Sequence, residues 1–73
     1  MEIGNLIKPT EESGFTLRCG SGQYDKAVVI SVSPFIITSE ESDMKWEATI
    51  KSEDFEVIGD VDKSTLKKCM RRL

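Results

Sequence analysis

Few residues in this chain could perform acid–base or nucleophilic chemistry. The sequence has no histidine, so the side chain that most often serves as a general base near neutral pH is missing, and no Ser–His or Cys–His pair can form. Three carboxylates, Glu40, Glu41 and Asp43, lie close together in a polar segment. Such a segment is typical of a solvated turn, which we favour over a paired acid and base. The sequence therefore predicts a protein that is not an enzyme.

The two cysteines, Cys19 and Cys69, also lack the spacing of a chemical site. A zinc site needs about four Cys, His or acidic ligands, and a redox pair usually has a CxxC spacing, whereas these cysteines are far apart in the sequence. They are also too few for the disulfide framework of a small secreted domain. We therefore expect free thiols, no metal and no cofactor.

The segment Gly20-Ser21-Gly22 is the one place that suggests a phosphate-binding loop. Such a loop carries Lys and then Ser or Thr after its second glycine, and it opens a helix. Here Gln23 and Tyr24 follow, and they lead into a segment of β type. The glycines therefore predict a tight turn instead.

Aromatic and polar side chains near this turn and near the acidic segment are candidates for binding a protein. Trp46 lies in an alternating segment, where burial is its first explanation. Alternatively, Met44 and Trp46 face outward beside Tyr24 and form the floor of a groove, because loops and strand margins often carry binding sites. The candidate protein-binding residues are Gln23, Tyr24, Glu40, Glu41, Asp43, Met44 and Trp46.

Charge is unevenly distributed along the chain, whose formal net charge is −3. Residues 1–61 contain five Lys or Arg and twelve Asp or Glu, whereas residues 62–73 contain five Lys or Arg and one Asp. An acidic body repels nucleic acid at long range, while a basic tail can contact phosphates or dock on the body. Cations in the last turn also stabilise a helix without any ligand. The candidate nucleic-acid contacts are Lys67, Lys68, Arg71 and Arg72.

Length and composition indicate one small globular domain. The chain has 73 residues, of which 38% are hydrophobic and 32% charged, and a domain of this size buries only about 60% of its unfolded surface. No apolar run approaches the ~20 residues of a membrane span. The N-terminus is acidic at Glu2, where a secretory signal would be basic. We expect a cytoplasmic protein with no membrane partner.

Six short segments have the composition and alternation of β-strands. Pro9 is expected to end the first segment, and residues 26–32, which are apolar on both faces, are expected to be central. A polar corner over residues 51–54 suits a single helical turn. The predicted strands cover residues 3–8, 15–19, 26–32, 35–39, 44–51 and 55–58. Alternation over residues 44–51 predicts one shared face for Met44, Trp46, Ala48 and Ile50.

After Gly59 the hydrophobic period changes from that of a strand to that of a helix. Ser64 is the expected N-cap. A helix of about nine residues is marginal alone in water, so we expect it to pack on or beside the β-domain. Its predicted apolar face comprises Leu66, Cys69, Met70 and Leu73. The predicted core of the β-domain comprises Val28, Ile30, Phe35, Ile37, Phe55 and Val57.

The order of these elements resembles a Src-homology-3-like (SH3-like) barrel, with five short strands, a long first connection and a one-turn helix before the last strand. More narrowly, the chain looks like the small uncharacterised barrel proteins of bacteriophages and prophages. The resemblance covers about residues 14–58. The resembling segments are Gly20-Ser21-Gly22-Gln23-Tyr24, Ala27-Val28-Val29, Ser33-Pro34-Phe35, Ser39-Glu40-Glu41-Ser42-Asp43-Met44-Lys45-Trp46 and Glu53-Asp54-Phe55-Glu56-Val57.

This resemblance implies an all-β (mainly β) fold, a small five-stranded SH3-like barrel that we place over residues 1–61. The helical period after Gly59 predicts that a short, amphipathic and basic C-terminal α-helix follows over residues 62–73. It implies the cytoplasm of a bacterial host and assigns no activity. The favoured function is a non-enzymatic interaction module of phage type that binds a host or phage protein. The alternative is a nucleic-acid-binding accessory protein that uses the basic helix. A homodimer is a further option, because residues 3–8 could form an unpaired edge strand.

Overall fold

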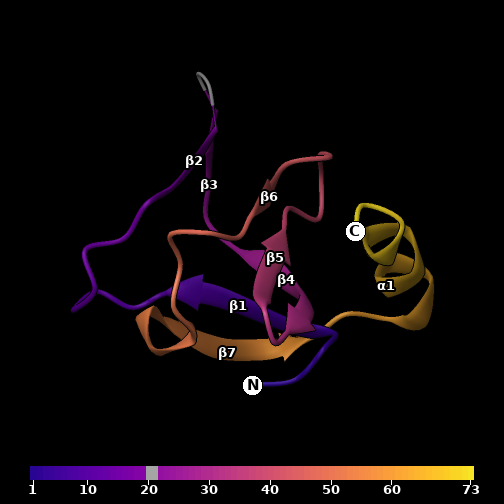
Figure 1. Cartoon of the computed structure of the whole chain (residues 1–73), viewed down its shortest axis with the longest axis horizontal. Coiled ribbons are helices and arrows are strands. Elements are labelled where there is room, and N and C mark those ends of the chain that lie inside the picture. The colour runs from indigo at the N-terminus through magenta and orange to yellow at the C-terminus, as the bar shows by residue number, and fades with distance from the viewer. Residues whose placement is uncertain (20–21) are drawn as a thin grey trace.

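An antiparallel sheet of five strands forms the centre of the molecule, and a helix packs on one of its faces (Figure 1). The computed structural model describes residues 1–19 and 22–73. The strand order in the sheet is β6-β5-β4-β1-β7. These strands are β1 (Asn5–Pro9), β4 (Ala27–Val32), β5 (Phe35–Thr38), β6 (Lys45–Trp46) and β7 (Phe55–Asp60).

Three smaller elements complete the chain. β2 (Leu17–Cys19) and β3 (Gly22–Tyr24) form a separate hairpin, η1 (Ser52–Asp54) is a single 3₁₀ turn before β7, and α1 (Lys63–Met70) is the only α-helix among the described residues. The predicted mainly β fold with a short C-terminal helix is therefore confirmed, as is the helical turn before the last strand. The turn predicted at Gly20-Ser21-Gly22 falls in part on residues 20 and 21, which lie outside the described residues. Gly22 itself belongs to β3.

The predicted barrel is not closed, because β6 and β7 are the two edges of the sheet. β1 is not an edge strand, which corrects the expectation for residues 3–8: it lies between β4 and β7 and pairs with both. Its register with β4 joins Leu6 to Val28 and Ile7 to Ala27. Dimerisation through an unpaired β1 edge is therefore excluded.

β1 ends at Pro9, as the sequence predicted, and Pro9 is its last paired residue, opposite Phe55 of β7. The amide of the next residue, Thr10, donates to Asp54 O on the β7 side at 2.9 Å. Because successive backbone N–H groups alternate in direction, the Pro9 nitrogen points toward the β4 side, where pairing has already ended at Ile7. Proline is therefore tolerated here, since no ladder bond needs its missing N–H.

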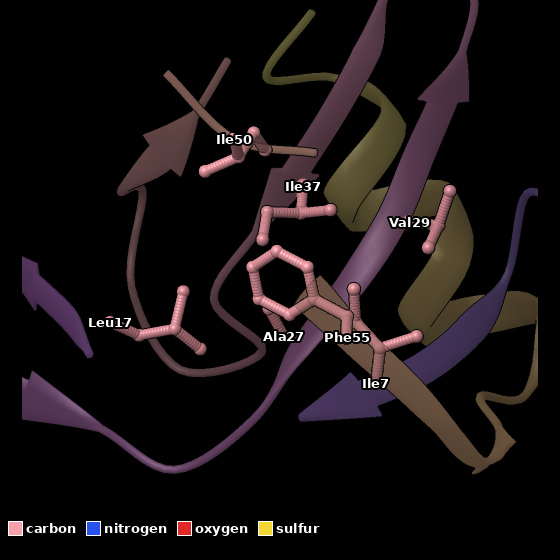
Figure 2. Packing of buried hydrophobic residues seen from close by; sticks show 7 residues of the cluster. All are labelled: Ile7, Leu17, Ala27, Val29, Ile37, Ile50 and Phe55. Atoms are coloured by element: carbon pink, nitrogen blue, oxygen red, sulfur yellow. The ribbon is translucent and has the colours of Figure 1, made fainter. Parts of the chain in front are cut away.

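The central strand β4 is buried on both faces, as its continuous apolar sequence predicted. Ala27 and Val29 face a larger core, and Val28 and Ile30 face a smaller one; all four side chains are fully buried. Figure 2 shows the larger core, with the Phe55 ring among side chains that come from several strands. The larger core comprises Ile7, Leu17, Ala27, Val29, Ile37, Ile50 and Phe55, with Phe15, Tyr24, Phe35 and Trp46 packed around it.

Helix α1 covers the opposite face of the sheet. Cys69 packs with Val28 and Ile30, and the apolar side chains around them come from β1, β5 and α1 and from the short link between β7 and α1. The alternation of Leu6 with Ile7 in β1 sends one side chain to each core. The partly buried members of this smaller core are Leu6, Ile36, Val61, Leu66, Met70. Leu73, predicted on the same face, is instead 54% exposed.

The strand predicted over residues 44–51 is much shorter in the structure. β6 contains only Lys45 and Trp46, and the chain then turns, with Ile50 N–H donating to Glu47 O at 3.4 Å. This turn leaves Ala48 exposed and returns Ile50 to the larger core. The prediction of one shared face is therefore wrong beyond Trp46. Ile50 reaches the larger core because the chain turns after β6, and not because β6 continues to pair with β5.

Val57 was predicted in the core, but its side chain is 50% exposed. The register between β1 and β7 shifts at this point: Leu6 pairs with Gly59 and Ile7 pairs with Val57, which leaves Ile58 without an opposite residue. Such a bulge breaks the strict alternation of faces. Val57 and Ile58 therefore both lie at the surface of an edge strand.

Two valine substitutions distinguish the central strand from the edge strand. Val29→Ala should lower the free energy of unfolding by about 2 kcal/mol, because it leaves a cavity in the larger core. Val57→Ala removes the same atoms from an exposed position and should cost less than about 1 kcal/mol. Urea denaturation of both variants measures the difference. Equal losses in the two variants would contradict the assignment of Val57 to the surface.

The N-terminus of α1 is capped by Asp62 and not by Ser64. Asp62 Oδ1 accepts from Thr65 N–H at 3.0 Å, while Ser64 Oγ donates to Asp62 Oδ2 at 3.1 Å. Gly4 lies against the helix with a φ of 95°, and a β-carbon there would lie 3.3 Å from Leu66 Cδ2. A glycine therefore suits the turn before β1. No helix in the described part of the chain is long and apolar enough to span a membrane.

The cap at Asp62 predicts a pH dependence. Its hydrogen bonds, first with Thr65 and then with Ser64, hold the pKa of the Asp62 carboxyl below its usual value. Because the folded-state pKa is lowered, the stabilisation is present above the ordinary carboxyl pKa and is lost as the pH falls through the lowered pKa. Asp62→Ala should therefore reduce stability at pH 7, and the difference from wild type should shrink below about pH 4. Urea denaturation at both pH values tests this. A difference that stays constant with pH would argue against a charged cap.

Candidate functional site: two hollows beside the β5–β6 hairpin

The loop of residues 39–44, which connects β5 to β6, is held in place by partly buried hydrogen bonds. Thr38 Oγ1 donates to Met44 O at 2.7 Å, and Ser39 N–H donates to the same oxygen at 3.0 Å. Ser39 Oγ in turn accepts from Glu41 N–H at 3.1 Å. Thr38 and Ser39 are both fully or almost fully buried. The loop therefore offers a fixed surface on each of its two sides.

Tyr24 and Trp46 connect this loop to the β2–β3 hairpin. Their rings meet edge to face, with centroids 5.8 Å apart and an interplanar angle of 71°. Trp46 Nε1 donates to Arg18 O at 3.1 Å, and Ser42 Oγ donates to the Tyr24 hydroxyl at 3.1 Å. Trp46 is half-buried at the margin of the larger core. Trp46 thus links β6 to the β2–β3 hairpin.

A small hollow lies between the two hairpins, with a volume of about 110 Å³. Four of the predicted protein-binding residues line it together: Gln23, Tyr24, Glu40 and Glu41. Asp43, Met44 and Trp46 do not line it. The three carboxylates in its wall outnumber the single cation. We call this the acidic hollow; its lining residues are Gln23, Tyr24, Asp25, Lys26, Ser39, Glu40 and Glu41.

Arg72 fastens the end of α1 to the same loop from the other side. Its Nη1 donates to Thr38 Oγ1 at 3.0 Å and to Ser39 O, and its Nε lies 3.4 Å from Asp43 Oδ1. The Arg72 side chain is only 16% exposed, whereas that of Asp43 is 96% exposed. Arg72 therefore acts in the structure as a clamp, and its guanidinium is already engaged, although the sequence suggested it as a phosphate contact.

Beside this clamp lies a second hollow of about 550 Å³. Its walls carry exposed cations from two elements, Lys45 of β6 and Lys68 and Arg71 at the end of α1. Lys67, also suggested as a phosphate contact, does not line it. We call this the basic hollow; its lining residues are Asp43, Lys45, Lys68, Arg71 and Arg72.

Cys69 is a free cysteine on the buried face of α1, at 1% exposure. Burial raises the pKa of its thiol, and the nearby positive charge of Arg72 only partly opposes that rise. A thiol that stays protonated at neutral pH is a poor nucleophile. Among the described residues, no group of three or more His, Cys, Asp or Glu is arranged to hold a metal ion.

Four lining residues were not among the candidates named from the sequence: Asp25, Lys26, Ser39 and Lys45. Ser39 directly precedes the candidate Glu40. Asp25 and Lys26 directly follow Tyr24 at the end of the β2–β3 hairpin, so a surface that includes Tyr24 also includes these two residues. Lys45 precedes Trp46 in β6, and alternation sends its side chain to the opposite face from Trp46. What the sequence could not indicate is that this opposite face meets the end of α1.

Comparison with known proteins gives no relative: no family model, no curated protein and no solved structure matches this chain. The resemblance to SH3-like phage proteins therefore stays a prediction.

Replacement of Arg72 tests the clamp through the reactivity of Cys69. In a Cys19→Ser background, Arg72→Gln should accelerate the reaction of Cys69 with Ellman's reagent by about tenfold or more, since a hydrogen bond to a charged group contributes about 1.5–3 kcal/mol. Loss of the positive charge itself would disfavour the thiolate, so acceleration reports opening of the helix.

Arg71→Gln is the matched control, because it removes the same charge from the adjacent, exposed position. Its reaction rate should stay at that of the Cys19→Ser parent. Similar acceleration by both variants would show that the charge of the helix end, and not the clamp, protects Cys69.

Proposed function

We propose that this chain is a non-enzymatic protein-interaction module that receives a basic side chain of a partner protein in the acidic hollow. The observation that carries the proposal is the meeting of two segments distant in sequence. Residues 23–26 of the β2–β3 side and residues 39–41 of the β5–β6 side line one hollow. The Tyr24–Trp46 contact and the Ser42–Tyr24 hydrogen bond hold these segments together.

The chemistry of the hollow favours a cation as its occupant. Asp25, Glu40 and Glu41 supply carboxylates, which only accept hydrogen bonds when ionised. A Lys or Arg side chain provides the complementary donors, and charge-assisted hydrogen bonds are stronger than neutral ones. Lys26 on the wall reduces the net negative charge and so favours a single cationic group.

The size of the hollow favours a side chain over a free small molecule. Its volume of about 110 Å³ lies well below the roughly 300–1,000 Å³ of typical small-molecule sites. A single side-chain head group fits a space of this size, while the rest of the partner would lie on the surrounding hairpins. The partner is therefore a protein or peptide segment that presents an exposed Lys or Arg.

We further propose that the fold is of the SH3-like class. Three features support this: the strand order β6-β5-β4-β1-β7, a long first connection that carries the β2–β3 hairpin, and the η1 turn before the last strand. This class serves many kinds of binding, so the fold alone does not select a partner.

Selection from a random peptide library tests the proposed function. Immobilised protein at low ionic strength should enrich peptides that contain Lys or Arg, because exposed charge pairs weaken as salt rises. The double variant Glu40→Gln/Glu41→Gln should lose this enrichment, since it removes two of the three carboxylates from the hollow.

The variant Glu11→Gln/Glu12→Gln provides a matched control, because it neutralises two adjacent exposed carboxylates outside the acidic hollow. It should keep the enrichment. Selection without basic peptides, or an equal loss in both double variants, would refute the proposed function.

A further inference from the structure

The basic hollow brings together cations from two elements that are far apart in the sequence. Lys68 lies in the last turn of α1 and Arg71, three positions later, is its C-cap, so both lie on the same side of the helix end. Lys45 comes from β6, the edge strand next to β5. The Arg72 clamp holds the helix end against the β5–β6 loop and so fixes these three cations around one space.

The charges on the walls do not cancel one another. Asp43 is the only carboxylate in the lining, and it lies 3.4 Å from the Arg72 guanidinium, which balances its charge. Lys45 has Glu47 as a neighbour, but the atoms are 3.9 Å apart and both side chains are exposed, so this pair is weak. Lys68 and Arg71 are exposed on the helix. Three positive charges therefore remain to attract a ligand.

The end of a helix normally repels anions, because its free carbonyl groups carry about half a negative charge. Three full positive charges outweigh that partial charge. The hollow also has a suitable size: its volume of about 550 Å³ falls within the roughly 300–1,000 Å³ of small-molecule sites.

We propose that the basic hollow binds phosphate groups through Lys45, Lys68 and Arg71. The guanidinium of Arg71 can contact two phosphate oxygens at once, while the two ammonium groups act as point charges. The acidic remainder of the chain disfavours a long duplex at a distance. The ligand is therefore either a small phosphorylated molecule or the phosphates of a short single strand, which share the same chemistry at this site.

Titration of isotope-labelled protein, followed by NMR, tests the proposal with two probes. Inorganic pyrophosphate and a short oligothymidylate should both shift the backbone amide signals of Lys45, Lys68 and Arg71. The Kd values of the two probes are then compared per phosphate group. A lower value for pyrophosphate would assign the site to small phosphorylated molecules, and a lower value for the oligonucleotide would assign it to single strands. No shift by either probe would overturn the proposal.

A pair of double variants separates the hollow from general charge. Lys68→Gln/Arg71→Gln should raise the apparent Kd for both probes about tenfold, since it removes two of the three free cations. Lys63→Gln/Lys67→Gln removes the same charge from the same helix at exposed positions outside the hollow, and it should leave the Kd within about twofold of wild type. An equal rise in Kd in the two double variants would overturn the proposal that the basic hollow is the binding site.

The basic hollow and the acidic hollow have no lining residue in common. Lys68→Gln/Arg71→Gln should therefore keep the enrichment of basic peptides, and Glu40→Gln/Glu41→Gln should keep the phosphate-induced shifts. Failure of one proposal leaves the other unaffected.

Discussion

β4 must be covered on both of its faces, and the arrangement of the other elements follows from that requirement. Its four fully buried residues alternate between the two cores. A chain of 73 residues has little material with which to cover two faces, because small domains bury a modest share of their surface. The β2–β3 hairpin and the returning segment at Ile50 complete one layer, and α1 supplies the other. Although α1 is too short to be stable in isolation, it becomes part of the core by packing on Val28 and Ile30.

The loop of residues 39–44 joins the two layers and carries both candidate surfaces. On one side it contributes Ser39, Glu40 and Glu41 to the acidic hollow, and on the other it contributes Asp43 to the basic hollow. Arg72 reaches the loop from α1, and Tyr24 reaches it from β3. Each contact satisfies polar atoms that would be costly to leave unpaired where they are buried. The carboxylates of the acidic hollow and the cations of the basic hollow can therefore lie close together without forming ion pairs across the loop. The loop between them is fixed by its own hydrogen bonds.

The sequence indicated the class of fold and several elements, and its failures have physical causes. A continuous apolar run revealed β4 as central, and the polar corner revealed η1, because both signals are local. Alternation misplaced Val57, since a bulge at Ile58 interrupts the two-residue period. It also extended β6 too far, because turn formation at Glu47 returns Ile50 to the core by another route. The sequence analysis grouped Gln23 and Tyr24 with Glu40 and Glu41, and these four residues line one hollow. The joining of Lys45 with Lys68 and Arg71 depends on the packing of α1, which no local pattern contains.

The position of β1 between β4 and β7 has a consequence for the order in which the molecule can assemble. The side chains of Asn5 and Asp60 share a hydrogen bond although they are 55 residues apart in the chain. Contacts of such large sequence separation slow folding, because the chain must close a long loop before they form. During synthesis, β1 can pair with β4 early. The other edge of β1 stays unpaired until β7 has left the ribosome. Over that interval the growing chain presents an unpaired strand edge, the feature through which nascent β-proteins aggregate and which chaperones shield.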